Sequence, residues 1–174
     1  MSTKHTVTLP DGTIAKRTSA NRVYPYAVAV GPAPKAEVLA MLGRALKAEK
    51  GYLARYERIV AYLENGGELV TKVDFMTSIM APGLGANERA LGYGNETREG
   101  ILAKYAGYAK QSANRIVQYG EEIAETTEGP ELIGEWTVSG WQSRAELAHK
   151  HRNHMQSVFP DRHVMVVETE YVTK

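Results

Sequence analysis

The sequence predicts an α+β fold: a small, mainly antiparallel sheet with one packed helix, and a long antiparallel helical hairpin inserted into it. Three patterns lead to this prediction. Both ends of the chain show strand-like alternation, two long central stretches show helical periodicity, and one amphipathic helix lies near the C-terminus. The expected domains are a discontinuous sheet module, residues 1–32 plus 134–174, and the helical hairpin at 33–133.

The N-terminal segment begins with a predicted β-hairpin. Strands at 6–9 and 13–18 flank Pro10-Asp11-Gly12, whose residue types supply the dihedral angles of a short turn. A third strand is expected at 23–30. Because Pro25 has no amide hydrogen to donate, this strand is predicted to be an edge strand, or to be bulged, near its start.

Two long helices are predicted in the middle of the chain. The first starts at Pro34, which suits a first helical turn, and ends before Asn65-Gly66-Gly67, while the second runs from near Thr97 to Thr127. Each helix carries a seam at alternating spacings of three and four, so the two should pack as an antiparallel pair. The seam residues are Val38, Leu42, Ala45, Glu49, Tyr52, Tyr56, Ile59 and Leu63 in the first helix, and Leu102, Tyr105, Ala109, Ser112, Ile116, Tyr119 and Ile123 in the second.

The C-terminal segment is expected to form a strand, a helix and a second strand. The first strand is placed at 136–141 and the second at 163–172. Ser143 precedes the helical pattern and Glu146 follows three residues later, which is the spacing of a capping box. Pro160 ends the helix.

Composition limits the class of protein. The chain has 174 residues and no cysteine, which excludes a disulfide scaffold and thiol chemistry. No apolar run approaches the ~20 residues that span a bilayer, and the N-terminus lacks a signal-peptide core, so we expect a cytoplasmic protein without a membrane partner. Residues 1–35 carry a net charge of +4, 36–135 of −4 and 136–174 of +1, far from the basic excess of a dedicated DNA-binding protein.

A protein-contact surface is predicted at and beside the tip of the helical hairpin. Residues 68–96 contain two glycine-rich loops, and residues 69–80 could form a short strand or helix. Tyrosines that fall off the seams suit a contact surface, because they combine a large apolar ring with a hydroxyl. The candidate residues are Tyr62, Asn87, Arg89, Tyr93 and Tyr108. The alternative is that these glycines and tyrosines serve turns and core packing.

A second candidate site binds an anion or a nucleotide. Basic residues from both ends of the chain accompany a serine and a tyrosine that could meet a phosphate: Lys16, Arg17, Ser19, Arg22, Tyr24, Arg144 and Arg152. Exposed amides at the start of the helix near Ser143 would favour the same ligand, although Glu146 already occupies that end. The alternative is a solvated basic face.

Neither a metal site nor a catalytic site is assigned. His149, His151, His154 and His163 cluster in sequence, but the spacing turns His149 away from His151 and His154, and neither an HExxH motif nor a cysteine is present. The glycine loops lack the features of a nucleotide-binding loop, so no cofactor is expected. Ser143 with His149 or His151 would need a helix-borne nucleophile, and no G-x-S-x-G motif exists.

Two segments resemble small accessory proteins that bacteriophages and other mobile elements encode: TVTLPDGTIAKRTSANRVYPYAVAV and GWQSRAELAHKH. The residues that carry the resemblance are Arg17, Ser19, Tyr24, Trp141, Arg144, Leu147, Ala148 and Lys150. The resemblance covers only the sheet module and carries over no catalytic residue. It implies an intracellular phage context, the host bacterial cytoplasm, where small proteins block host defence systems or enzymes by binding.

The leading hypothesis is a non-enzymatic phage or mobile-element protein that inhibits a bacterial defence system. Its partner would be a host protein or nucleoprotein complex bound by the hairpin and its Tyr/Gly-rich tip, and self-association along the helices would give a homo-oligomer. The second hypothesis is a nucleotide or nucleic-acid binding protein that uses the basic residues. The third is a small hydrolase or transferase.

Overall fold

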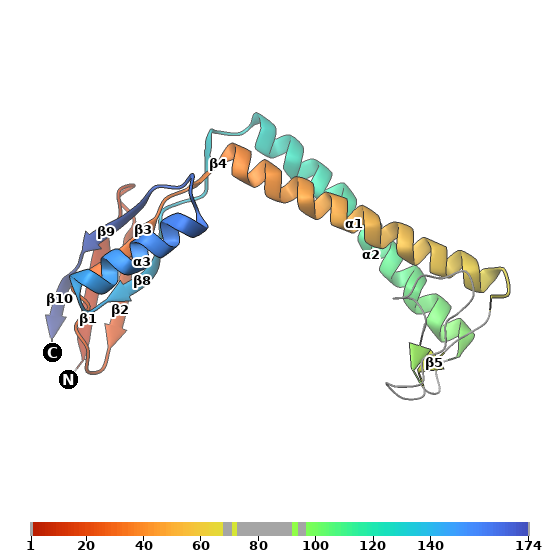
Figure 1. Cartoon of the computed structure of the whole chain (residues 1–174), viewed down its shortest axis with the longest axis horizontal. Helices are drawn as coiled ribbons and strands as arrows, with labels where there is room; N and C mark the ends of the chain where they lie inside the picture. The colour runs from red at the N-terminus through yellow and green to blue at the C-terminus, as the bar shows by residue number, and fades with distance from the viewer. Residues whose placement is uncertain (1, 68–70, 73–91, 94–96, 174) are drawn as a thin grey trace. The chain divides into compact units, whose positions relative to one another are not determined.

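The computed structural model describes residues 2–67, 71–72, 92–93 and 97–173 (Figure 1). It confirms the predicted α+β class, with antiparallel three-stranded sheets, one helix beside them and one long helical hairpin. The chain divides into two compact units. The terminal unit contains residues 1–40 and 126–174, and the hairpin unit contains residues 41–125.

Two antiparallel sheets form most of the terminal unit. Sheet A has the strand order β10-β1-β2, with β1 at Thr3–Thr8, β2 at Ile14–Ser19 and β10 at Glu170–Thr173. Sheet B has the order β8-β3-β9, with β3 at Tyr26–Val30, β8 at Thr137–Gln142 and β9 at Val164–Glu168. The two ends of the chain pair directly, because β1 lies antiparallel to β10.

Sheet B is covered on both faces. One face packs on sheet A, where Val7 of β1 and Leu9, which follows β1, cluster with Ala27 and Ala29 of β3. The other face packs on α3 (Ala145–Val158), where Val28, Val30 and Val164 contact Ala148. The central strand β3 is therefore buried from Ala27 to Val30, which explains its short, continuous run of small apolar residues.

The predicted turn between β1 and β2 is confirmed. The amide of Leu9 donates to the carbonyl of Thr13 at 2.8 Å, and Gly12 takes the left-handed φ of 85° that the turn requires. Asp11 accepts a hydrogen bond from the amide of Thr13 at 2.9 Å. That bond holds the pKa of the Asp11 carboxyl below its ordinary value, and a second amide, from Trp136, acts in the same direction.

The prediction that the third strand lies at a sheet edge is wrong. β3 is the central strand of sheet B, and it begins at Tyr26, one residue after Pro25. The missing amide of Pro25 therefore falls outside the ladder, and its carbonyl still accepts from the amide of Thr169 at 2.9 Å. A bulge does occur, but it places the extra residue, Ser139, in the facing strand β8.

The predicted capping box of α3 is also wrong. The N-cap is Arg144, with extended φ and ψ of −139° and 144°, and it makes no side-chain cap hydrogen bond. The helix begins one residue later than predicted, so Ser143 precedes the N-cap position. A capping box requires its serine at the N-cap, from which the hydroxyl accepts from the amide three residues later.

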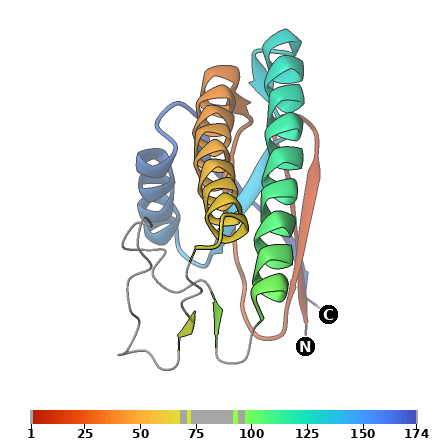
Figure 2. The ribbon, with the colours of Figure 1, turned by 90° about the vertical axis from the view of Figure 1, so that its right-hand side faces the viewer.

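The hairpin consists of α1 (Lys35–Glu64) and α2 (Arg98–Glu128), which lie side by side (Figure 2). Their main apolar cluster holds Ile59, Leu63 and Ile101. The seam prediction placed the first two correctly and omitted Ile101. Neither of these helices, nor any other helix in the described residues, is long and apolar enough to cross a membrane.

Two short pairings complete the described structure. β4 (Ala33–Pro34) and β7 (Leu132–Ile133) pair antiparallel at the base of the helices. β5 (Thr71–Lys72) and β6 (Gly92–Tyr93) form a parallel pair. Most of the segment 69–80, predicted as a short strand or helix, and the glycine-rich loop at 81–87 lie outside the described residues.

Candidate functional site

Four tyrosines form a cluster that joins the two helices of the hairpin unit. Tyr52 and Tyr56 come from α1, and Tyr105 and Tyr108 come from α2. The ring centroids of Tyr52 and Tyr56 are 6.4 Å apart in a stacked arrangement. Tyr56 lies 6.1 Å from Tyr105 and 5.4 Å from Tyr108, and those two rings meet edge to face at 5.9 Å. We call these four residues the tyrosine cluster.

Helical spacing and antiparallel packing together produce this cluster. Tyr52 and Tyr56 are four residues apart, and Tyr105 and Tyr108 are three apart, so each pair projects from one side of its helix. Tyr52 is 49% exposed and Tyr108 is 39% exposed. The seam prediction for Tyr52 is therefore wrong in part, because the ring reaches its neighbours but half of it remains in water.

The tyrosine cluster is supported from both sides along the helices. On one side, Tyr105 packs against the buried cluster of Ile59, Leu63 and Ile101. On the other side, one turn from Tyr52, the buried carboxylate of Glu49 accepts a hydrogen bond from the α2 hydroxyl of Ser112 at 2.7 Å. The rings are thus held on a defined helix register, which limits the entropy that they would lose on binding.

The predicted protein-contact residues lie in different places. Tyr108 belongs to the tyrosine cluster. Tyr62 instead packs against Ile59, Leu63 and Ile101, and it is partly buried. Asn87 and Arg89 lie outside the described residues, as does the side chain of Tyr93, whose backbone lies in β6.

Four of the predicted anion-site residues come together in the terminal unit. The guanidinium carbon of Arg17 lies 4.4 Å from the ring centroid of Tyr24. Ser19 donates a short hydrogen bond to the carbonyl of Arg22, and His5 lies between these groups, with its Nε2 3.2 Å from both the Ser19 hydroxyl and the Arg22 carbonyl oxygen. The stacked guanidinium of Arg17 is exposed at the side of β2, an edge strand of sheet A.

The other three predicted anion-site residues lie elsewhere. Lys16 pairs with Thr6 and, because side chains alternate along β2, it projects from the opposite face to Arg17. Arg144 precedes α3, and Arg152 in α3 donates from Nε to the carbonyl of Val164 at 3.4 Å.

Sequence reasoning missed His5 as the centre of the anion-site group. The residue is 1% exposed, and its Nδ1 has no hydrogen-bond partner among the residues that the structure describes. Tyr24, Trp141 and Tyr171 surround the ring, with centroid distances of 5.5, 6.2 and 6.0 Å. The available signal was the alternation of β1, since His5 falls on the same side as buried Val7.

Among the histidines of the C-terminal segment, His151 has a defined set of polar contacts. Its Nδ1 lies 2.8 Å from the amide nitrogen of Gln142, and its Nε2 lies 3.3 Å from the hydroxyl of Ser139. An amide nitrogen only donates, so Nδ1 accepts and the ring proton lies on Nε2. The two contacts connect His151 of α3 with Ser139 and Gln142 of β8.

Of the remaining histidines of this segment, two line one hollow and one lies apart. His154 is exposed on α3, while His149 and His163 lie near β9. In the described part of the chain, no group of three or more histidine, cysteine, aspartate or glutamate side chains is placed to hold a metal ion.

No protein family, curated protein or solved structure matches this chain. The candidate functional sites are therefore two residue groups of the chain itself, the tyrosine cluster and the group around His5.

Proposed function

We propose that this chain is a non-catalytic binding protein whose helical hairpin contacts a protein partner through the tyrosine cluster. The observation that carries the proposal is the half-exposed rings of Tyr52 and Tyr108, held by contacts with Tyr56 and Tyr105 on both helices. Tyrosine is enriched in interfaces because it buries much apolar area with few rotatable bonds.

The geometry of the cluster supports a role beyond packing. A tyrosine needed only for the hairpin core would pack against the buried apolar residues, as Tyr62 does against Ile59 and Leu63. Tyr52 and Tyr108 instead leave large parts of their rings in water, next to more buried neighbours. An exposed aromatic centre beside well-packed residues is the arrangement in which interface residues contribute most to affinity.

The resemblance of the terminal segments to bacteriophage accessory proteins extends the proposal to the partner. The partner would be a host protein or nucleoprotein complex in a bacterial cell, including a component of a defence system that this chain inhibits. Self-association of the hairpin through the same rings is the competing use of the surface, and it would appear as a concentration-dependent mass.

Affinity capture from bacterial lysate tests the proposal. The immobilised wild-type chain is compared with a Y52S/Y108S double variant and with V117S. Val117 is 61% exposed on α2, outside the tyrosine cluster, so it controls for the loss of exposed apolar surface on the same unit. We expect the double variant to capture at least ~10-fold less of a protein that the wild type retains specifically, because the centre of the interface is removed. V117S should capture as much of that protein as the wild type.

Equal retention by all three chains, or no specific retention by the wild type, would contradict the proposal. Circular dichroism melting of each variant separates loss of binding from loss of folding. Sedimentation analysis of the wild type alone distinguishes a second copy of the chain from a different protein.

A second candidate function is anion or nucleic-acid binding by the terminal unit. The observation that favours it is the guanidinium of Arg17 stacked on Tyr24, beside Ser19 and Arg22. Stacking fixes the plane of a guanidinium and leaves its edge available for a phosphate, which lowers the ordering cost of binding.

A further inference from the structure

The free edge of β9 has a defined set of outward-facing backbone groups. In an antiparallel pair, successive residues turn their amide and carbonyl groups alternately toward and away from the neighbouring strand. The amide of Gly31 donates to the carbonyl of His163, and Ala29 pairs with Met165 two residues further along. Met165 and Val167 therefore face β3, whereas Val164, Val166 and Glu168 direct their backbone groups outward.

No strand covers that edge in the described part of the chain, where β9 pairs only with β3. One outward group is occupied, since the carbonyl of Val164 accepts the long hydrogen bond from Arg152. The amides and carbonyls of Val166 and Glu168 remain directed away from the sheet, as a template for one more strand.

A trough runs beside this edge, between β9 and α3. It consists of two adjoining hollows of about 360 and 460 Å³, which share Arg152, His163 and Val164 as lining residues. The first hollow extends to Gln156, Asp161 and Arg162, and the second extends to His149. His149, Arg152 and Gln156 are three and four residues apart, so they form one polar stripe of α3 along the strand edge. We call this feature the edge trough.

The charge of the larger of the two hollows favours an acidic occupant. The larger hollow is lined by one arginine, two imidazoles and three apolar residues of β9, with no carboxylate among its described lining residues. Within the described residues, the polar contacts of Arg152 are with neutral groups, the carbonyl of Val164 and, at 3.0 Å, the side-chain oxygen of Asn153. Its charge is therefore not neutralised by a carboxylate in these contacts.

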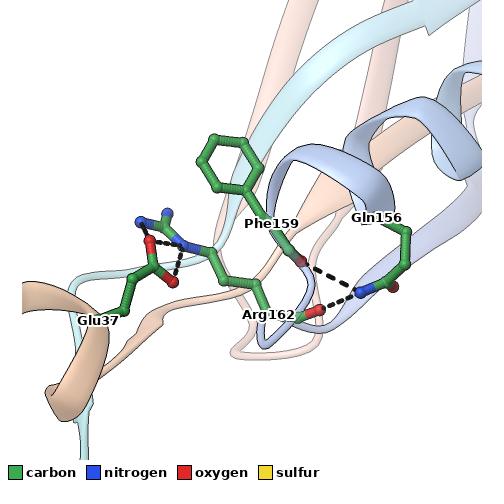
Figure 3. A network of polar contacts seen from close by, with 4 residues as sticks. All are labelled: Glu37, Gln156, Phe159 and Arg162. Carbon is green, nitrogen blue, oxygen red and sulfur yellow. Dashed lines mark hydrogen bonds and ion pairs between the residues drawn. The ribbon is translucent and has the colours of Figure 1, made fainter.

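The neighbouring arginine, Arg162, is already paired. Its Nε and Nη2 donate to the carboxylate of Glu37 at 3.1 and 2.6 Å, and its guanidinium lies over the ring of Phe159 (Figure 3). Gln156 in turn donates to the carbonyls of Phe159 and Arg162, which fixes the loop at one end of the edge trough (Figure 3). Of the two arginines that line the edge trough, Arg152 is thus the one that has no carboxylate partner among the described residues.

From these observations we propose that an extended, acidic segment of another protein binds as an added strand on the free edge of β9. Its backbone pairs with Val166 and Glu168, and an acidic side chain meets Arg152 in the edge trough. A second copy of β9 is the competing occupant, because two-fold pairing about Val166 would place its Glu168 opposite Val164, beside Arg152; a chain that sediments as a dimer without peptide would overturn the proposal. This surface is separate from the tyrosine cluster, so either proposal can fail alone.

Nuclear magnetic resonance with a capped hexapeptide that alternates valine and glutamate tests this proposal on the full chain. We expect the added strand to slow hydrogen exchange about tenfold or more at the amides of Val166 and Glu168 under saturating peptide. The amides of Met165 and Val167 already donate within sheet B, so they should change little. Simple ionic attraction to Arg152 would not produce this alternation along the strand.

Charge and side-chain controls complete the test. R152Q should weaken peptide binding by about 10-fold or more, the range expected for one charge-assisted hydrogen bond. K150Q removes the same charge from an exposed residue, which lies about 160° from Arg152 around the helix, and it should change affinity less than about twofold. The proposal is overturned if a valine–lysine peptide binds equally well, if the exchange pattern does not alternate, or if neither peptide binds at millimolar concentration.

Discussion

Glu49 and Ser112 join the two helices of the hairpin through a hydrogen bond of 2.7 Å. Both residues are buried, since Glu49 is 6% exposed and Ser112 is 3% exposed. Arg115 lies 3.6 Å from the same carboxylate and is largely in water. Few apolar residues are buried along this hairpin, so a sliding of one helix by a turn would cost little apolar contact. A buried polar pair opposes that sliding, because only one register satisfies it.

The first prediction concerns this pair. S112A removes a donor from a buried carboxylate and should destabilise the chain by about 1–3 kcal/mol in chemical denaturation. E49L/S112A replaces both polar partners and should recover part of that loss, since no buried carboxylate is left without its donor. Stability of S112A equal to that of the wild type would show that the hydrogen bond does not hold the register.

The second prediction concerns Gly140 and the His151 ring that packs against it. A Cβ at Gly140 would lie 2.7 Å from Nδ1 of His151, too close for any carbon at that position. G140A should therefore displace the ring from Gln142 and Ser139 and destabilise the chain by about 1–3 kcal/mol. G140A/H151A removes the clash and should be more stable than G140A alone. If G140A melts like the wild type, the contact between α3 and β8 is not made as described.

The third prediction is a pH dependence that arises from Glu37. The hydrogen bonds from Arg162 hold the pKa of the Glu37 carboxyl below its ordinary value, and the charge of the guanidinium adds to that effect. A lowered folded-state pKa means that the stabilisation is fully present above the ordinary carboxyl pKa. It is lost as the pH falls through the lowered value.

E37Q gives the measurement of that pH dependence. At neutral pH this variant should be less stable than the wild type by about 0.5–1 kcal/mol, a modest amount because both side chains are partly in water. The difference should shrink as the pH is lowered below the ordinary glutamate range. A difference that stays constant down to low pH would assign the effect to something other than the ionised pair.

Much of the fold could be predicted because its signals are long or local. Thirty residues of helical periodicity without proline define α1, and the Asp11-Gly12 pair defines the first turn. The errors arose where one residue decides the outcome. Pro25 does not weaken β3, because pairing begins just after it, and α3 starts after Arg144, where local spacing alone favours Ser143.

The candidate sites were harder to predict than the fold, since they depend on pairing between distant segments. Alternation separates Lys16 from Arg17, but only the strand register shows that Arg17 meets the group around His5. Helical spacing predicts the seam of Tyr52 and Tyr56. It does not predict that the antiparallel partner leaves Tyr52 half exposed, because that depends on the side chains opposite it.

The fourth prediction tests the anion site with a matched pair of neighbouring cations. R17Q removes the guanidinium that stacks on Tyr24, whereas K16Q removes a charge from the opposite face of the same strand. If a phosphate binds at the Arg17 group, R17Q should weaken binding of a short single-stranded DNA and lower the salt slope by about 0.7, while K16Q should change both much less. Y24S should act in the same direction as R17Q, because it releases the guanidinium from its fixed plane. Fluorescence anisotropy at several salt concentrations measures DNA binding by the wild type and the three variants. Equal losses of affinity in R17Q and K16Q would indicate diffuse electrostatic attraction instead of a specific anion site.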